Sequence, residues 1–277
     1  MCFVCVGMSR RPAFWPRVRL IAKHDSARRC HLPLDGVYCP RRLCIGKGKV
    51  NVEKEYLISG IDTGIGKTVA TGLIARHLAL RALDVITVKM VQTGNDGFSE
   101  DLDAHRALSG HERFPEDREG FTAPQIFKFP SSPLLAAELE GKTVDLDRIA
   151  EAVRICAAKH DVTLVESAGG LDVPLTRDTL TADFAAGRGW PVILVTCGRL
   201  GAINHALLSL DAAKLRGIEI AGVVHNTYFS QDPRLDTDAR DAILRHLERL
   251  GYPPVLVPIP GIDVSSVPDV DFSEIFA

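Results

Sequence analysis

The sequence predicts a three-layer α/β/α fold built around a mostly parallel sheet. From Glu55 onward, short runs rich in β-branched residues alternate with longer stretches of helical periodicity. Most of the short runs are apolar at consecutive positions, which is typical of strands covered on both faces. Strands and helices that alternate in this way join through right-handed crossovers and place helices on both faces of one sheet.

The expected elements follow one another without an internal repeat or a strong linker. The strands are expected at residues 56–59, 85–89, 162–166, 192–196, 220–225 and 255–259. The helices are expected at residues 67–82, 103–109, 133–139, 146–159, 180–187, 202–216 and 234–250. Residues 110–124 are polar and carry several charges, so we expect a surface loop over the carboxyl edge of the sheet.

The composition is ordinary for a globular protein. Of 277 residues, 46% are hydrophobic and 25% are charged, which is close to average usage. No apolar run reaches the roughly 18 residues that a membrane-spanning helix needs. Cys156 and Cys197 lie inside apolar segments, where buried reduced thiols of a cytoplasmic protein are the simplest interpretation. We therefore expect a cytoplasmic location and no membrane partner.

The first fifty residues differ from the rest of the chain. They hold eleven Lys and Arg against two Asp and Glu, together with five of the seven cysteines. Such a segment suits a targeting peptide or a nucleic-acid tether, but its spacings do not form the paired knuckles of a zinc ribbon. We favour a disordered extension over residues 1–53, or translated sequence ahead of a start near Val50. Residues 54–277 then form one domain.

The strongest motif is GIDTGIGKT, from Gly60 to Thr68, between an apolar strand and an amphipathic helix. This context is that of a phosphate-binding P-loop. Glycines at 64 and 66 let backbone N–H groups turn toward phosphate oxygens, and the helix N-terminus adds partial positive charge. Lys67 is placed to reach the β- and γ-phosphates and the Thr68 hydroxyl to bind magnesium. The motif predicts a P-loop NTPase fold that binds ATP, although five residues instead of four separate Gly60 from Gly66.

Magnesium prefers oxygen ligands, so a P-loop needs acidic partners. Glu166 ends an apolar strand and is followed by small residues, which places its carboxylate in the crevice at the strands' carboxyl ends. Asp103 is the second candidate, at the expected start of a helix, where a plain N-cap is an equally good interpretation. Asp101 is an alternative to Asp103 as the second acidic ligand.

Lys89 ends an otherwise apolar strand and precedes MVQTG. An ammonium group there lies in the crevice, where it can hold an anion next to the γ-phosphate. A solvent-facing strand end is the alternative interpretation. His205, in the first turn of an expected helix, suits a structural or interface role better than a catalytic one. Asn226 ends another apolar strand and is placed to contact a nucleotide base.

Several separated motifs together resemble the dethiobiotin synthetase family of biotin biosynthesis. They are GIDTGIGKT, KMVQTG, DLDAHRALSG, VESAGGLDVPLT and PVILVTCGRLGAINHALLSL, in that order between residues 56 and 262. The resemblance implies an ATP- and magnesium-dependent ring closure with 7,8-diaminopelargonic acid and carbon dioxide as substrates. An amine would add carbon dioxide to give a carbamate, which attacks the γ-phosphate. The second amine would then close the ureido ring and release phosphate, with ADP as the other product.

The resemblance also implies roles for individual residues. Lys89 and Lys67 would be catalytic, Thr63 and Thr93 would bind substrate, and residues 201–205 would lie at a homodimer interface. The magnesium ligands would be Thr68, Asp103 and Glu166. The nucleotide-binding residues would be Gly64, Ile65, Gly66, Lys67, Thr68, Val69, Asp103, Glu166, Ser167, Ala168, Gly169, Asn226, Thr227, Pro260, Gly261 and Ile262.

This chain departs from the family pattern at four positions. Met90 follows the active lysine where proline is usual, Ser167 replaces a glycine, Leu134 stands where histidine is common, and Ile61 replaces a threonine. None of these changes removes a charge or a donor assigned above. The small-molecule substrates and ATP remain the expected partners, and no nucleic acid is expected.

Two other classes of P-loop protein remain as alternatives. An amidoligase of the cobyrinic-acid diamide synthase type usually carries a glutaminase domain, for which this chain has no room. A switch ATPase of the ParA or MinD type carries a signature lysine near the start of its loop. That stretch here is Ile61-Asp62-Thr63.

Overall fold

The computed structural model describes residues 55–230, 232–262 and 266–277. The predicted extension over residues 1–53 lies outside the described residues. Within them, the main sheet has six strands in the order β2-β5-β1-β6-β7-β8. Every pair of neighbouring strands in this sheet is parallel, and the sheet confirms the predicted α/β fold.

The strands are short and, except for the edge strand at residues 256–259, almost wholly buried. They are β1 (Glu55–Gly60), β2 (Val85–Lys89), β5 (Val162–Glu166), β6 (Val192–Cys197), β7 (Ile220–Asn226) and β8 (Leu256–Ile259). A separate pair of two-residue strands, β3 (Gln92–Thr93) and β4 (Ile126–Phe127), lies outside the main sheet. Burial on both faces explains why apolar residues stand at consecutive positions in the sequence.

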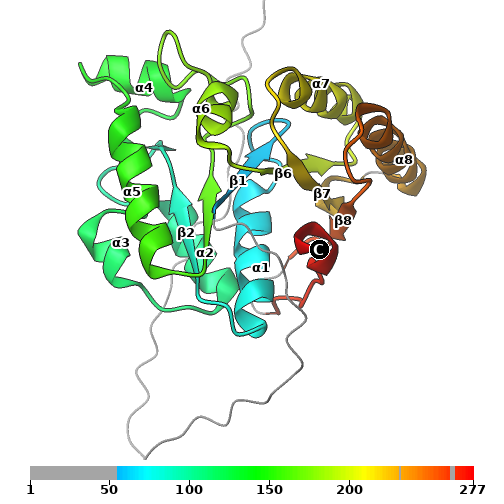
Figure 1. Cartoon of the computed structure of the whole chain (residues 1–277), viewed down its shortest axis with the longest axis horizontal. Coiled ribbons are helices and arrows are strands. Elements are labelled where there is room, and N and C mark those ends of the chain that lie inside the picture. The colour runs from blue at the N-terminus through cyan, green and yellow to red at the C-terminus, as the bar shows by residue number, and fades with distance from the viewer. Residues whose placement is uncertain (1–54, 231, 263–265) are drawn as a thin grey trace, which may run out of the picture. The chain divides into compact units, whose positions relative to one another are not determined.

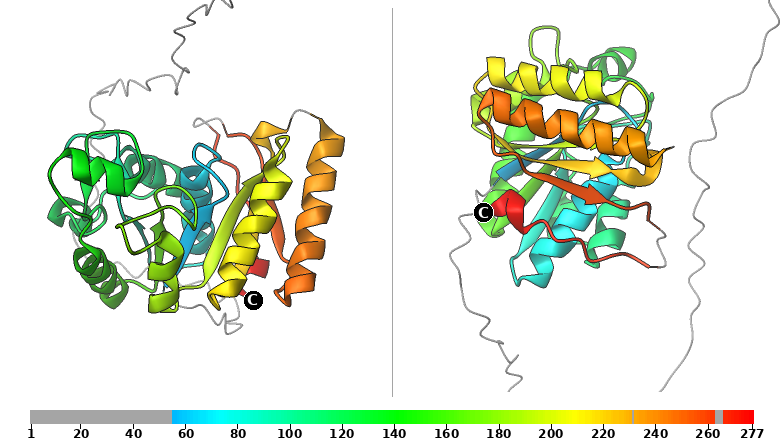
Figure 2. Two further views of the ribbon diagram at one scale, coloured as in Figure 1. Left: turned by 90° about the horizontal axis from the view of Figure 1, so that it is seen from above. Right: turned by 90° about the vertical axis from the view of Figure 1, so that its right-hand side faces the viewer.

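Helices cover both faces of the sheet (Figure 1). One face carries α1 (Lys67–Leu80) and α2 (Glu100–Ser109), and the opposite face carries α7 (Ala202–Leu215) and α8 (Pro233–Leu250) (Figure 2). The remaining helices are α3 (Pro115–Glu119), α4 (Pro133–Leu139), α5 (Leu146–Lys159) and α6 (Thr181–Arg188). The chain changes direction in the sheet after β2, so β1 and β5 neighbour each other and their carboxyl ends flank one crevice.

Residues 110–124 are more ordered than the expected surface loop. They contain α3, and the Asp117 and Thr122 side chains are buried within them. The Thr122 carbonyl accepts a hydrogen bond of 2.7 Å from the Lys89 backbone N–H. Asp117 forms a buried ion pair with Arg106 of α2 at 2.7 Å. The polar residues of this segment therefore pair with one another and with the sheet edge, which sequence polarity alone did not indicate.

The C-terminal segment completes the apolar core. Phe272 is fully buried, and its ring packs edge-on against the His77 ring of α1 at 5.5 Å between centroids. The Phe276 ring packs in the same way against Tyr56 of β1 at 5.2 Å. Figure 1 shows this end of the chain beside α1. Residues 272–276 are thus part of the core.

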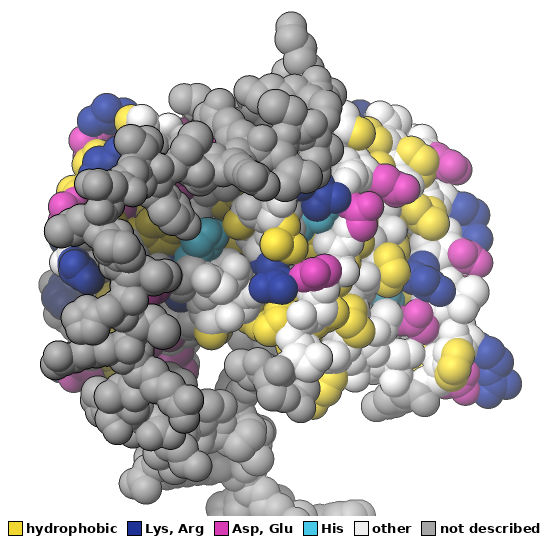
Figure 3. Space-filling model, turned by 90° about the horizontal axis from the view of Figure 1, so that it is seen from below, with side chains coloured by type: hydrophobic (Ala, Val, Ile, Leu, Met, Phe, Trp, Pro, Cys, Tyr) yellow, Lys and Arg dark blue, Asp and Glu magenta, His cyan; other side chains and the backbone are white. Residues whose placement is uncertain are grey.

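No helix within the described residues is both long and apolar enough to cross a membrane. Cys156 and Cys197 are free and buried, as expected. Charges of both signs are interspersed with single hydrophobic side chains on the coloured part of the face in Figure 3.

The packing of the C-terminal segment leads to a prediction about stability. Phe272→Ala should lower the free energy of unfolding by about 3–5 kcal/mol, because it opens a cavity between the segment and α1. Phe98→Ala is the matched control, because the Phe98 side chain is 47% exposed. This substitution should change the free energy of unfolding by less than about 0.5 kcal/mol. Denaturant unfolding of both variants tests this. Equal stability of the two variants would contradict a core role for Phe272.

Candidate functional site

The loop between β1 and α1 has the backbone geometry of a phosphate cradle. Gly64 and Gly66 both have positive φ angles, of 72° and 96°. A Cβ atom at Gly66 would lie 2.3 Å from the Asn226 side-chain nitrogen, so only glycine fits there. The loop ends at Lys67, where α1 begins without a side-chain cap. The free N–H groups of this first turn are the kind that bind phosphate in P-loop proteins.

Lys67 lies buried inside this loop. Its Nζ donates a hydrogen bond of 2.9 Å to the Asp62 carbonyl. Burial and the nearby charge of Lys89 lower the pKa of Lys67 to about 8. The Asp62 carboxylate is held by Arg199, from the loop that follows β6. An arriving anion would favour the protonated form of Lys67, which suits this residue to phosphate binding.

A cluster of opposite charges lies beside the loop. Lys89 and Glu166 are register partners at the carboxyl ends of β2 and β5. Lys89 Nζ lies 2.7 Å from Glu166 Oε1 and 2.7 Å from Asp101 Oδ2. The Thr68 hydroxyl lies 2.8 Å from Asp101 Oδ1 and 3.1 Å from Glu166 Oε1. Three oxygen-bearing side chains and one ammonium thus meet at the start of α1.

The charges of this cluster stabilise one another. Burial by itself would raise the pKa of Glu166, but the Lys89 charge and the His105 hydrogen bond hold it well below its usual range. Burial would likewise lower the pKa of Lys89, but the charges of Glu166 and Asp101 raise it above its usual value. Both groups are therefore charged at neutral pH.

The structure corrects the assignment of Asp103. Its side chain is 47% exposed and pairs with Arg113 at the surface, so it does not reach the cluster. The physical reason is the start of α2. The Ser99 hydroxyl accepts a hydrogen bond from the Leu102 backbone N–H and caps a helix that begins at Glu100, three residues before the predicted start. Positions two apart point to different sides of a helix, so Asp101 faces the crevice and Asp103 faces away.

The residues that were predicted to contact the nucleotide base, 226–227 and 260–262, lie on the other side of the phosphate-binding loop. Asn226 ends β7, and its side-chain amide donates 2.9 Å to the Ile65 carbonyl of the loop. The Thr227 hydroxyl donates 3.0 Å to the Ile259 carbonyl at the end of β8. Gly261 packs closely on the Tyr228 ring. Residues 226–227 and 260–262 therefore lie on the β7–β8 side of the loop, opposite Lys89 and Glu166 in strand order.

The remaining predicted residues are near the strand ends but make fewer contacts with the cluster. The Ser167 hydroxyl donates 2.9 Å to the Gly169 carbonyl and so shapes the turn after β5. Thr93 ends β3 and is partly exposed. Thr63 is exposed in the loop, where its backbone N–H donates to Asp62.

Sequence reasoning missed two residues that contact Glu166. The Thr71 hydroxyl lies 3.1 Å from Glu166 Oε2, and His105 Nε2 lies 2.7 Å from the same oxygen. Thr71 lies one helical turn after Lys67, which is a signal available in the sequence. His105 lies four residues after Asp101 and therefore on the same side of α2, but this spacing points to Glu166 only once the helix start is known.

The donor set fits a divalent cation that binds together with a nucleotide. Among the described residues, no group of three or more His, Cys, Asp or Glu side chains is arranged to hold a metal ion. The two carboxylates and one hydroxyl around Lys89 Nζ are hard oxygen donors. Magnesium in phosphate sites uses one or two carboxylates and completes its shell with phosphate oxygens and water. Thr68, Asp101 and Glu166 could therefore hold magnesium, whereas Asp103 could not.

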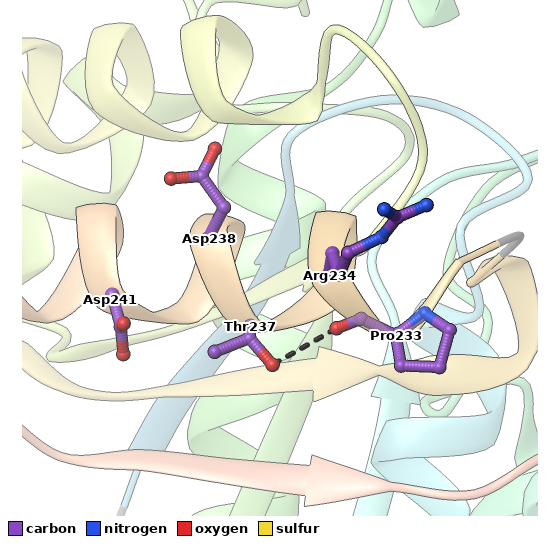
Figure 4. A pocket seen from close by; sticks show the side chains of 5 residues that line it. All are labelled: Pro233, Arg234, Thr237, Asp238 and Asp241. Atoms are coloured by element: carbon purple, nitrogen blue, oxygen red, sulfur yellow. Dashed lines mark hydrogen bonds between the residues drawn. The ribbon is translucent and has the colours of Figure 1, made fainter.

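A surface hollow elsewhere offers a poorer site. Its five lining residues, Pro233, Arg234, Thr237, Asp238 and Asp241, all belong to the first turns of α8 (Figure 4). The Thr237 hydroxyl is already bonded to the Pro233 carbonyl at 2.9 Å. The Arg234 guanidinium is paired with Asp232. Two of its polar side chains thus already have partners, and the hollow lacks the convergence of charges found at the loop.

Comparison with known proteins agrees with this geometry. A family described as AAA domain matches residues 54–268. The ATP-dependent dethiobiotin synthetase BioD of Chlorobaculum tepidum is 45% identical over 206 residues, covering 74% of this chain and 86% of the relative. BioD 2 of Pasteurella multocida is 42% identical and covers 71% of this chain and 92% of the relative.

Solved structures are more distant. A ParA family ATPase from Chlorobium tepidum is 17% identical, with a TM-score of 0.45 over 76% of this chain and 85% of that chain. This likeness is too loose to bear on function. The match over residues 54–268 and the identity to the two BioD relatives show that the chain belongs to the ATP-dependent dethiobiotin synthetase family.

Proposed function

We propose that this protein is an ATP-dependent dethiobiotin synthetase. It closes the ureido ring of dethiobiotin from 7,8-diaminopelargonic acid and carbon dioxide, and it releases ADP and phosphate. The observation that carries the proposal is the convergence of Lys67, Thr68, Lys89 and Glu166 at one end of the sheet. It is supported by relatives that bear this name and are 45% and 42% identical to the chain over the aligned residues.

The loop supplies the nucleotide site. Backbone N–H groups around Gly64 and Gly66 and the protonated Lys67 hold the β- and γ-phosphates. Asn226 fixes the loop to β7 and lies on the side where the base would bind. Thr68, Asp101 and Glu166 would hold magnesium, which supplies charge neutralisation on the transferring phosphoryl group. Binding and orientation account for most of the rate in phosphoryl transfer, because the protein has little covalent chemistry to perform.

Lys89 provides the second positive charge of the site. A carbamate formed on one substrate amine carries negative charge, and its oxygen attacks the γ-phosphorus as the bond to ADP breaks. The second amine then attacks the carbamate carbon, and the carbon–oxygen bond to phosphate breaks as the ring closes. An ammonium at the end of β2 is placed to stabilise the charge that develops in both steps. Thr93, four residues later at the end of β3, and Thr63, in the loop after β1, remain the proposed substrate contacts.

We further propose that the enzyme is a cytoplasmic homodimer. The buried free thiols of Cys156 and Cys197 suit a reducing compartment. Leu200, in the loop before α7, and Leu208, in the middle of α7, are 82% and 58% exposed, which suits a contact with a second copy. Sedimentation equilibrium that gives the mass of a single chain would contradict the dimer.

The reaction itself can be tested directly. Purified protein incubated with ATP, magnesium, bicarbonate and 7,8-diaminopelargonic acid should form dethiobiotin and ADP in equal amounts, detected by mass spectrometry. Omission of any one component should prevent product formation. ATP hydrolysis that continues at the same rate without the diamine, with no dethiobiotin formed, would refute the proposed function and favour a switch ATPase.

Substitutions of Lys67 and Lys89 should have different effects on ATP binding and on turnover. Lys67→Ala should abolish turnover and weaken ATP binding, because the phosphates lose a charged contact. Lys89→Ala should largely retain ATP binding but lower kcat by about 100- to 1,000-fold, as expected for a charge that acts mainly in the transition state. Lys128→Ala, at a side chain that is 67% exposed, is the control. Normal activity of Lys67→Ala would exclude the loop as the phosphate site.

The two aspartates of α2 offer a matched comparison. Asp101→Ala should raise the magnesium concentration needed for half-maximal activity by at least about 10- to 100-fold, the loss typical of residues that only support metal ligands. Asp103→Ala should leave it unchanged, since this carboxylate pairs with Arg113 at the surface. Steady-state rates at a series of magnesium concentrations give the answer. A larger effect of Asp103→Ala would reverse the assignment.

A further inference from the structure

His105 occupies a position in the site that the proposed reaction does not explain. Its side chain is fully buried in α2, and its two ring nitrogens contact different groups. Nε2 lies 2.7 Å from Glu166 Oε2, and Nδ1 lies 3.0 Å from the Thr87 hydroxyl in the middle of β2. A histidine that bridges a sheet residue and a buried carboxylate can orient that carboxylate.

The two carboxylate oxygens of Glu166 face different parts of the structure. Oε1 faces the crevice, where Lys89 Nζ lies at 2.7 Å and the Thr68 hydroxyl at 3.1 Å. Oε2 faces the space between α1 and α2, where it accepts from His105 and Thr71. The carboxylate therefore presents one oxygen to the site and has the other fixed from behind.

The hydrogen bond from His105 has a defined direction. Arg106 can only donate, and its Nη1 donates 2.7 Å to the Thr87 hydroxyl oxygen. The same hydroxyl lies 3.0 Å from His105 Nδ1 and so holds the other side of the ring. The ionised Glu166 carboxylate can only accept, so His105 Nε2 carries a proton and donates a hydrogen bond to Oε2. This assignment rests on the donor and acceptor inventory of the four side chains.

The chain of contacts is anchored away from the crevice. The Arg106 guanidinium binds the buried Asp117 carboxylate through two nitrogens, at 2.9 and 2.7 Å. Asp117 in turn accepts from the Thr122 hydroxyl and from the Phe114 backbone N–H. Arg106 therefore cannot turn to satisfy another group, so the Thr87 hydroxyl and the His105 ring keep the orientation described above.

We propose that His105 is a positioning residue that fixes the rotation of the Glu166 carboxylate, so that Oε1 alone is presented to a divalent cation bound with ATP. This inference rests on the proposed function for the presence of the cation. Without the His105 donor, Oε2 would keep only the weaker contact with the Thr71 hydroxyl. The carboxylate could then rotate, and the cation site would lose its fixed geometry. Outer groups of this kind typically contribute 10- to 100-fold in metal affinity.

The test measures metal binding and not turnover. Full-length protein saturated with the β,γ-imido analogue of ATP is titrated with Mn²⁺, and free Mn²⁺ is followed by electron paramagnetic resonance. His105→Leu should weaken Mn²⁺ binding by about 10- to 100-fold. His105→Gln keeps an N–H donor at similar reach and should stay within about threefold of the unsubstituted protein.

Two controls separate positioning from a general loss of structure. His246→Leu removes another buried histidine, which is bonded to Asp211 between α8 and α7, and should not change Mn²⁺ binding. Binding of the analogue in the presence of EDTA should be equal in all variants. Unchanged Mn²⁺ affinity in His105→Leu would overturn the proposal, and so would a loss in His105→Gln as large as that in His105→Leu.

Thr87→Val tests the relay behind the histidine and does not depend on the folding of His105→Leu. It removes the hydroxyl that directs the ring and should reproduce part of the loss in Mn²⁺ affinity. In the double variant Thr87→Val/His105→Leu the two losses should not add, because both act through Glu166. Full additivity would overturn the relay. If Mn²⁺ binding behaves as expected but no dethiobiotin is formed, the proposed function fails and this inference stands.

Discussion

The ion pair between Lys89 and Glu166 is the constraint on which the rest of the site depends. Both side chains are almost fully buried, at 7% and 1% exposed, and burying either charge alone would cost several kcal/mol. Their register at the ends of β2 and β5 brings the charges together. Removal of one charge would leave the other buried without its ion-pair partner. The apolar sheet must therefore end in a charged crevice at this point.

The surrounding elements are arranged to satisfy that pair. Helix α1 contributes the hydroxyls of Thr68 and Thr71, and α2 contributes Asp101 and His105, so both helices meet at one carboxylate. The longest-range of these contacts, between Thr68 and Glu166, joins residues 98 positions apart in the chain. A site assembled from such distant segments forms only when the whole sheet is in register, which links the integrity of the fold directly to the geometry of the site.

The strands and the loop could be predicted because their signals are local. Runs of consecutive apolar residues mark buried strands, and a lysine or glutamate at the end of such a run projects into the crevice. Lys89 and Glu166 were found in this way. Asp101 and His105 could not be assigned with the same certainty, because their directions depend on where α2 begins. The Ser99 cap moves that start from Asp103 to Glu100. Asp101 therefore lies inside the helix, where two positions separate it from Asp103 and their side chains point about 200° apart.

The burial of Phe272 and Phe276 makes the folding of this domain depend on the synthesis of its final segment. Phe272 and Phe276 fill space against α1 and β1, which are the first elements of the domain to be made. While the chain is still being translated, the hydrophobic surfaces of those early elements lack their final cover. Nascent protein therefore exposes this aggregation-prone surface until residues 272–276 have been made and can pack against it.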